Sequence, residues 1–165
     1  ATIDVGAIGK GYATEKAAQY LENKGCTSYV LNIGGNIRII GTKVDGDGWV
    51  TGIKDPKNTE TYAFYTKISN TSCVTSGDYE RYFIADGKKY HHIIDSETLM
   101  PANYFSSITI ITKDSGLADT LSTALFCMNY EDGLKLVESL GNVEVLWIYS
   151  DGSQKTTDGM ISIKQ

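Results

Sequence analysis

Short turn signals between strand-like segments constrain the fold of this chain more than any other feature. Asp86-Gly87 separates residues 82–85 from residues 89–94, and Asp-Gly between such segments is a strong β-hairpin signal. Asp151-Gly152 and Asp45-Gly46-Asp47-Gly48 provide the same turn chemistry elsewhere. Because such short turns join antiparallel strands, these signals predict a largely antiparallel sheet.

The other two turn signals each predict a specific strand pair. Residues 143–149 should pair with residues 160–163, and residues 37–40 with residues 49–53. Further strand-like segments, rich in β-branched and aromatic residues, are residues 3–5, 29–33, 62–69, 73–74 and 106–112. Strands therefore outnumber helices in the predicted structure.

Three segments have the periodicity of amphipathic helices. Apolar residues recur at four-residue intervals within residues 12–24, and Gly25 provides a C-terminal stop. Two more helices are predicted at residues 117–128 and 130–140. We therefore predict one domain over residues 1–165, of the α+β class, with a largely antiparallel sheet packed with helices.

Charge excludes one class of function. Lys and Arg total 15 against 20 Asp and Glu, which gives a net charge of −5 and a pI near 5.0. Nonspecific nucleic-acid binding needs a basic surface, so no nucleic-acid partner is expected. Phosphate groups would have to be held through a metal ion or backbone N–H groups. The three cysteines, which form no CxxC motif, are expected to be small buried side chains: Cys26, Cys73 and Cys127.

Two glycine-rich segments could approach a ligand. Residues 4–11 run from a short strand through Gly6, Gly9 and Gly11 into a helix, and the free N–H groups of a helix N-terminus suit a phosphate. The alternative for this loop is a tight packing turn. Gly34-Gly35 interrupts a strand, and its spacing favours a bulge over a ligand contact.

Two further segments carry polar groups. Residues 75–81 contain small hydroxyl side chains and Arg81, which could hold a phosphate or a planar ring, or could form a capped turn. His91 and His92 are the only histidines. As neighbours on a strand they should point to opposite faces, so both cannot bind one metal ion. One can face a site, although a structural role is the alternative.

A third cluster lies at the start of the helix predicted at residues 117–128. Asp119 and Thr123 are four residues apart and therefore share a helix face, with Ser122 beside them. A carboxylate with hydroxyl oxygens suits Mg²⁺, which takes few protein ligands and completes its shell with phosphate oxygens and water. The alternative is a capped, solvated helix start.

Taken together, these segments resemble the ApbE family, the FAD:protein FMN transferases. The matching stretches occur in family order over the whole chain, and they cover the C-terminal part of the family's usual length. We therefore expect a C-terminal portion of a longer protein. The stretches are residues 4–13, 32–38, 75–82, 90–95 and 118–124.

The resemblance implies an activity. Such enzymes bind FAD with Mg²⁺ and move FMN to a threonine hydroxyl of an acceptor flavoprotein, with release of AMP. Two alternatives are a truncated flavin-binding domain without catalysis and an FAD pyrophosphatase that yields FMN and AMP. Family members are mostly exported, many as lipoproteins, so the full-length protein is expected to be anchored to the membrane outside the cytoplasm.

The resemblance also implies roles for individual residues. The metal ion would bind the carbonyl of Ala7 and the side chains of Asp119 and Thr123, and Ser122 stands where many relatives have a second carboxylate. The expected FAD contacts are Asp4, Lys10 and the backbone near Ile94. His92 is the candidate catalytic base or positioning group for the acceptor threonine, because an imidazole titrates near neutrality.

Overall fold

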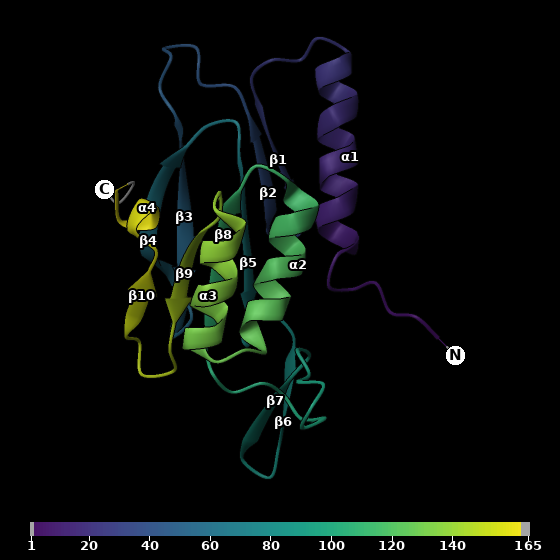
Figure 1. The fold of residues 1–165 in the computed structure, drawn as a ribbon, viewed down its shortest axis with the longest axis vertical. Coiled ribbons are helices and arrows are strands. Elements are labelled where there is room, and N and C mark those ends of the chain that lie inside the picture. The colour runs from purple at the N-terminus through teal and green to yellow at the C-terminus, as the bar shows by residue number, and fades with distance from the viewer. Residues whose placement is uncertain (1, 163–165) are drawn as a thin grey trace.

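A six-stranded antiparallel sheet forms the centre of the molecule (Figure 1). The computed structural model describes residues 2–162. Every neighbouring pair of strands in this sheet is antiparallel, as the turn signals predict. In spatial order the strands are β1 (Tyr29–Ile33), β2 (Asn36–Ile40), β5 (Ser72–Gly77), β8 (Ser107–Thr112), β9 (Glu144–Ile148) and β10 (Gln154–Thr156).

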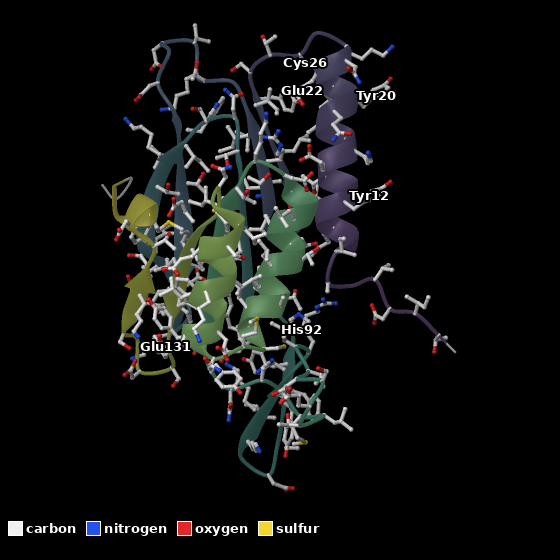
Figure 2. The ribbon with its side chains drawn as sticks, in the orientation of Figure 1. Tyr12, Tyr20, Glu22, Cys26, His92 and Glu131 are labelled. Atoms are coloured by element: carbon white, nitrogen blue, oxygen red, sulfur yellow. The ribbon has the colours of Figure 1, made fainter. Side chains whose placement is uncertain are left out.

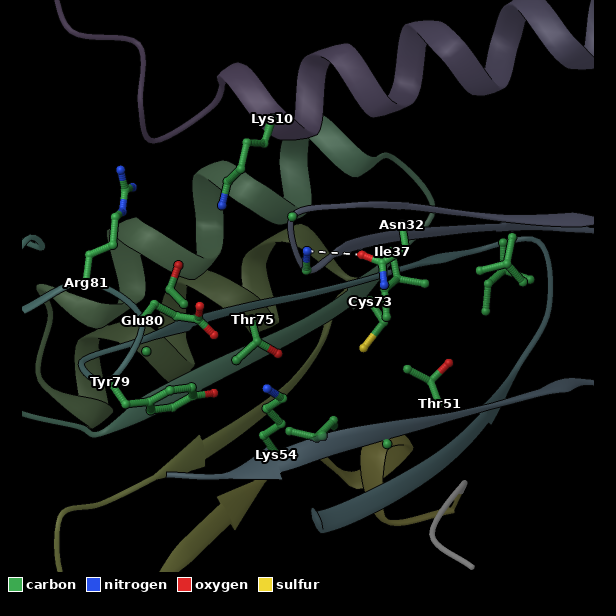
Figure 3. A pocket seen from close by; sticks show the side chains of 18 of the residues that line it. Lys10, Asn32, Ile37, Thr51, Lys54, Cys73, Thr75, Tyr79, Glu80 and Arg81 are labelled. Carbon is green, nitrogen blue, oxygen red and sulfur yellow. Dashed lines mark hydrogen bonds between the residues drawn. The ribbon is translucent and has the colours of Figure 1, made fainter. Parts of the chain in front are cut away.

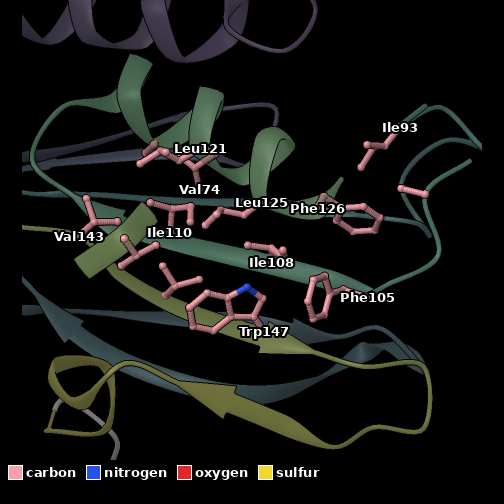
Figure 4. Close-up of a cluster of buried hydrophobic side chains, with 14 residues drawn as sticks. Val74, Ile93, Phe105, Ile108, Ile110, Leu121, Leu125, Phe126, Val143 and Trp147 are labelled. Atoms are coloured by element: carbon pink, nitrogen blue, oxygen red, sulfur yellow. The ribbon is translucent and has the colours of Figure 1, made fainter. Parts of the chain in front are cut away.

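Three helices cover one face of the sheet (Figure 1). They are α1 (Gly9–Asn23), α2 (Ser115–Phe126) and α3 (Tyr130–Leu140). Between helices and sheet lies the larger core, in which the fully buried Trp147 and Phe126 are the bulkiest side chains (Figure 4). None of the helices within residues 2–162 is long and apolar enough to cross a membrane.

A separate hairpin covers the opposite face. It consists of β3 (Trp49–Asp55) and β4 (Asn58–Ile68). Its Ile53 and Phe64 pack in a second core with Cys73 of β5 and Leu146 of β9. Side chains alternate along a strand, so the central strands β5, β8 and β9 contribute to both cores, and the molecule has three layers. The short helix α4 (Asp158–Ser162) adds Met160 to the second core.

The turn signals were accurate locally but incomplete. Asp86-Gly87 joins β6 (Tyr82–Ala85) to β7 (Lys88–His91), and both turn residues have positive φ, as predicted. The Asp151-Gly152 hairpin also forms, but the partner of β9 is β10, residues 154–156. The prediction for residues 160–163 was wrong: residues 160–162 belong to α4, and Ile163 lies outside the described residues.

The predicted pairing of residues 49–53 with residues 37–40 was also wrong. β2 has β1 on one edge and β5 on the other, so no edge is free for a third strand. β3 therefore pairs with β4 and crosses to the other face. The turn dipeptides indicate where the chain reverses, but pairing depends on which edges remain open.

The expectations for the N-terminal segment and for the burial of the cysteines were partly wrong. Residues 3–5 are exposed and form no strand, and α1 begins at Gly9 rather than near Tyr12. All three cysteines are free thiols, but only Cys73 is buried; Cys127 is half-buried and Cys26 is exposed.

Candidate functional site

A cleft of about 1090 Å³ lies between the β1–β2–β5 part of the sheet and the β3–β4 hairpin. Polar side chains from separate elements converge on it, including Lys10, Thr75 and Lys54 (Figure 3). Its volume is at the upper end of the range for small-molecule sites. The cleft therefore has room for a ligand as large as a dinucleotide.

The N-terminus of α1 forms one rim of the cleft, and a close helix crossing fixes its position. An added Cβ on Gly11 would overlap the Ser115 carbonyl oxygen and lie 2.5 Å from the Asp119 Cβ. Only glycine permits this approach of α1 to α2. The loop of residues 4–11 is thus a tight packing turn and, through Asp4, Gly6, Gly9 and Lys10, also a wall of the cleft.

Asp119 caps α1 from a different helix. Its carboxylate Oδ2 accepts a hydrogen bond of 2.7 Å from the Gly11 N–H, and the residue is only 3% exposed. In a regular helix that N–H group would donate to the carbonyl oxygen of Ala7. The other carboxylate oxygen, Oδ1, lies 4.0 Å from Lys10 Nζ, so Asp119 connects the helix crossing to the rim of the cleft.

Ser122 connects α2 to β5. Its hydroxyl lies 2.7 Å from the Ser76 hydroxyl and 2.9 Å from the Asp119 carbonyl oxygen, and the residue is fully buried. Ser76 lines the cleft. Ser122 thus supports the wall of the cleft from behind.

A buried polar network that the sequence analysis missed holds α1, α2 and β2 together. Glu15 Oε2 accepts from Arg38 Nε at 3.2 Å and from the Ser115 N–H at 3.0 Å. Ser115 also hydrogen-bonds Asn36. A signal was available, because Asn36 and Arg38 alternate with Ile37 and Ile39 along β2, which predicts a polar and an apolar face. In the structure this polar face is buried, and Arg38 on it contacts Glu15 of α1.

Gly34-Gly35 is a turn rather than the favoured bulge. Ile33 pairs with Asn36, and both glycines have positive φ, as a two-residue hairpin turn requires. Gly35 N–H donates to Asn32 Oδ1 at 3.1 Å (Figure 3). Both glycines line the cleft, so the turn lets the backbone border the ligand space.

Residues 75–81 follow the floor of the cleft. Thr75, Tyr79 and Arg81 all line it. The Tyr79 ring covers Gly77, and burial raises the pKa of its hydroxyl well above the usual value, so this phenol stays protonated. Arg81 is exposed at the mouth.

The two histidines have different surroundings, as their strand positions predict. His91 is buried, with Nε2 donating to the Ala102 carbonyl at 2.8 Å and Nδ1 accepting from Ile93 N–H at 3.3 Å. His92 is exposed and lines the cleft. Its Nδ1 lies 3.2 Å from the Arg81 carbonyl, and a carbonyl oxygen can only accept, so Nδ1 carries the proton. Nε2 of the neutral ring therefore keeps a lone pair.

Although His92 is exposed, partial desolvation of its ring is the main cause that lowers its pKa below the ordinary value of 6.5. The hydrogen bond to the Arg81 carbonyl opposes the shift, while the charges of Arg81, His91 and Lys10 add to it. The neutral, proton-accepting ring is therefore the form present at neutral pH.

Known proteins share both the sequence and the fold. The ApbE family matches residues 1–147. The chain belongs to the ApbE family. It is 36% identical to the FAD:protein FMN transferase of Treponema pallidum, over 96% of this chain and 47% of that protein. The Vibrio cholerae enzyme of the same name is 35% identical, over 95% and 46%. This chain thus spans about half the length of the curated relatives it matches.

Solved ApbE structures confirm the α+β fold. The ApbE protein of Thermotoga maritima superposes with a TM-score of 0.90 at 37% identity, covering 99% of this chain and 54% of that one. The apo flavinyl transferase ApbE of Pseudomonas stutzeri gives a TM-score of 0.81 at 30% identity, covering 98% and 51%. The predicted family and fold class are both confirmed.

The expected ApbE ligand residues fall into three groups. Asp4, Lys10 and His92 line the cleft. Asp119 and Ser122 lie behind its wall and reach it through Lys10 and Ser76. The remaining three do not line the cleft: Ala7 and Ile94 are exposed, and Thr123 is half-buried.

Ile94 has contacts of its own away from the cleft. It forms an isolated antiparallel bridge with Pro101, and its carbonyl oxygen accepts from Cys127 Sγ at 3.7 Å. In this structure its carbonyl oxygen already has a protein partner, and its flavin-binding role stays a prediction.

The donor groups expected of an ApbE metal site fit Mg²⁺. Within residues 2–162 no three His, Cys, Asp or Glu side chains cluster as a transition-metal site would need. Gly11 N–H donates to Asp119, so the Ala7 carbonyl oxygen does not receive this N–H and remains available. Thr123 follows one turn along α2. One carboxylate with neutral oxygens suits a cation that also takes phosphate oxygens.

Proposed function

We propose that this chain carries the metal-binding and FAD-binding part of an FAD:protein FMN transferase. The reaction would move FMN from FAD to a threonine hydroxyl of an acceptor flavoprotein and release AMP. The observation that carries the proposal is Asp119, a buried carboxylate that caps α1 at Gly11 while its second oxygen faces Lys10 at the cleft. By resemblance, the full-length protein would be anchored outside the cytoplasm.

The residues in and behind the cleft wall would have separate roles in binding FAD, holding the metal ion and accepting a proton. Lys10 and the N-terminus of α1 would attract the pyrophosphate of FAD. Ala7, Asp119 and Thr123 would hold Mg²⁺, with Ser122 fixing α2 behind them. When bound, Mg²⁺ neutralises pyrophosphate charge and stabilises the AMP leaving group. His92 Nε2 would accept the proton of the acceptor threonine as its oxygen bonds to the FMN phosphorus.

An FAD titration with and without Mg²⁺ tests this proposal. Asp119→Asn keeps an oxygen that can accept from Gly11 N–H but loses the charge, so Mg²⁺-dependent FAD affinity should fall about tenfold or more. Asp132→Asn removes an exposed carboxylate on α3 and is the matched control. Equal FAD affinity of wild type and Asp119→Asn in Mg²⁺ would refute the metal assignment.

The intact mass of an acceptor protein distinguishes the alternatives. A gain of the mass of FMN less one water on the acceptor supports transfer. AMP release without acceptor labelling supports the FAD pyrophosphatase, and FAD binding without AMP release supports a binding domain.

A further inference from the structure

The β6–β7 hairpin protrudes from the body of the molecule (Figure 1). It forms its own two-stranded sheet, and the neighbours Phe83 and Ile84, which point to opposite faces of β6, are both exposed. His92 lies at its base (Figure 2), and both His92 and Arg81 line the cleft. The hairpin therefore lies directly next to His92.

The strand register gives one face of the hairpin a distinct chemistry. Phe83 pairs with Tyr90, and their rings stack at 5.3 Å with an interplanar angle of 11°. Residues two apart on a strand share a face, so Lys88, Tyr90 and His92 form one row. We call this the Phe83–Tyr90 face.

The aromatic pair on this face is open to solvent. Phe83 is 64% exposed and Tyr90 is half-buried. Stacked aromatic rings at the surface are typical anchors for a partner's apolar side chain.

The charges on the Phe83–Tyr90 face are positive. Arg81 and Lys88 are exposed, and within residues 2–162 neither forms an ion pair. Lys88 Nζ lies 5.4 Å from the Tyr90 ring centroid. Lys89 belongs to the other face, where it pairs with Asp78 at 2.9 Å. A net acidic chain thus presents two unpaired cations around an aromatic pair, next to the His92 ring.

From this arrangement we propose that the Phe83–Tyr90 face docks an extended, acidic segment of the acceptor protein, with its threonine at His92. This inference rests on the proposed function and identifies where its protein substrate binds. Extended chain has the same residue spacing as the hairpin. With threonine at His92, an apolar residue two positions away meets the Phe83–Tyr90 pair, and an acidic residue four positions away meets Lys88.

That register defines a probe peptide. It has threonine at its centre, leucine two residues away on each side, glutamate four residues away on each side, and serine at the positions between them. This symmetric sequence can bind in either chain direction. Fluorescence anisotropy of the labelled peptide measures its binding to the full chain with FAD and Mg²⁺ present. A second peptide has lysine in place of glutamate. We expect the glutamate peptide to bind more tightly.

Variants of the hairpin test the face itself. Phe83→Ala should weaken binding of the glutamate peptide about tenfold, and Lys88→Glu should reverse the preference between the two peptides. Ile84→Ser is the matched control, because Ile84 is 67% exposed on the other face of the same strand; it should leave binding unchanged. Circular dichroism of each variant verifies folding.

Three outcomes would overturn the proposal: equal binding to wild type and Phe83→Ala, no binding of either peptide, or wild-type dimers that dissociate in Phe83→Ala. The last outcome, read by sedimentation, would make the face an interface between copies of this chain. The FAD titration is run on the same samples. If the wild-type chain binds the glutamate peptide but does not bind FAD, the proposed function is refuted, whereas the Phe83–Tyr90 face is still a docking site.

Discussion

At the residue scale, adjacent histidines have opposite tautomers because their backbone partners differ. His91 donates through Nε2 and His92 through Nδ1, each to a carbonyl oxygen. The buried ring has both nitrogens satisfied, whereas His92 keeps Nε2 free toward the cleft. Sequence position alone predicted that the two rings diverge, but not which one would be buried. That depended on Phe126, against which the His91 ring packs edge-on at 5.6 Å.

The lowered pKa of His92 predicts a pH profile for transfer. A base must be neutral, and the ring protonates only below its ordinary value of 6.5, so the rate should be level above that pH and fall below it. Arg81→Gln removes a charge that lowers this pKa, so the pKa should rise and the acid limb move to higher pH. Rate profiles and NMR titration of the His92 ring measure both.

Replacement of His92 completes this test. His92→Asn should reduce transfer by about 10²-fold, with FAD affinity retained. An unchanged rate, or an acid limb that does not shift when the NMR-measured pKa does, would exclude His92 as the base.

At the scale of elements, the α1–α2 crossing determines whether the residues proposed to bind the metal ion can meet. Gly11→Ala would place a Cβ against the Ser115 carbonyl and Asp119. Overpacking of this kind should destabilise the fold by about 1–3 kcal/mol and weaken Mg²⁺-dependent FAD binding. Urea unfolding and the FAD titration measure the two effects.

Gly9→Ala is the matched control, two residues earlier in the same helix. Its Cβ would be 3.8 Å from Val5, an ordinary contact, so stability should be unchanged or slightly higher. Equal destabilisation by both substitutions would mean that the close crossing at Gly11 is not the cause, because helix propensity itself favours alanine over glycine.

Local chemistry predicted the elements far better than their partners. The limits of α3, from Tyr130 to Leu140, followed from periodicity and Gly141, and the β6–β7 hairpin followed from Asp86-Gly87. The strand pairing predicted across Asp45–Gly48 was wrong because it depends on which strand edges are free. No local sequence pattern contains that information. The Glu15–Arg38 pair was missed for a similar reason: only the tertiary fold buries it.

At the scale of the whole molecule, the cleft exists because the β3–β4 hairpin folds over the sheet as a third layer. Asp4, Lys10, Thr75 and Arg81 were all in segments that the sequence singled out. The opposing wall, which includes Trp49 and Lys54, was not predicted to be part of a site, because nothing in its sequence indicates which face of the sheet it covers.

A ligand in this cleft should therefore contact both the central sheet and the β3–β4 hairpin. Under the proposed function, FAD with Mg²⁺ would bind only the folded chain, so at a hundred times its Kd it should stabilise the fold by about 2.7 kcal/mol. Hydrogen exchange should slow in residues 4–11 and along β3, which line the cleft, and should remain unchanged in α3 and β10, which lie away from it. Protection confined to the β6–β7 hairpin would instead place the flavin on the Phe83–Tyr90 face, and both the cleft assignment and the docking proposal would fail together.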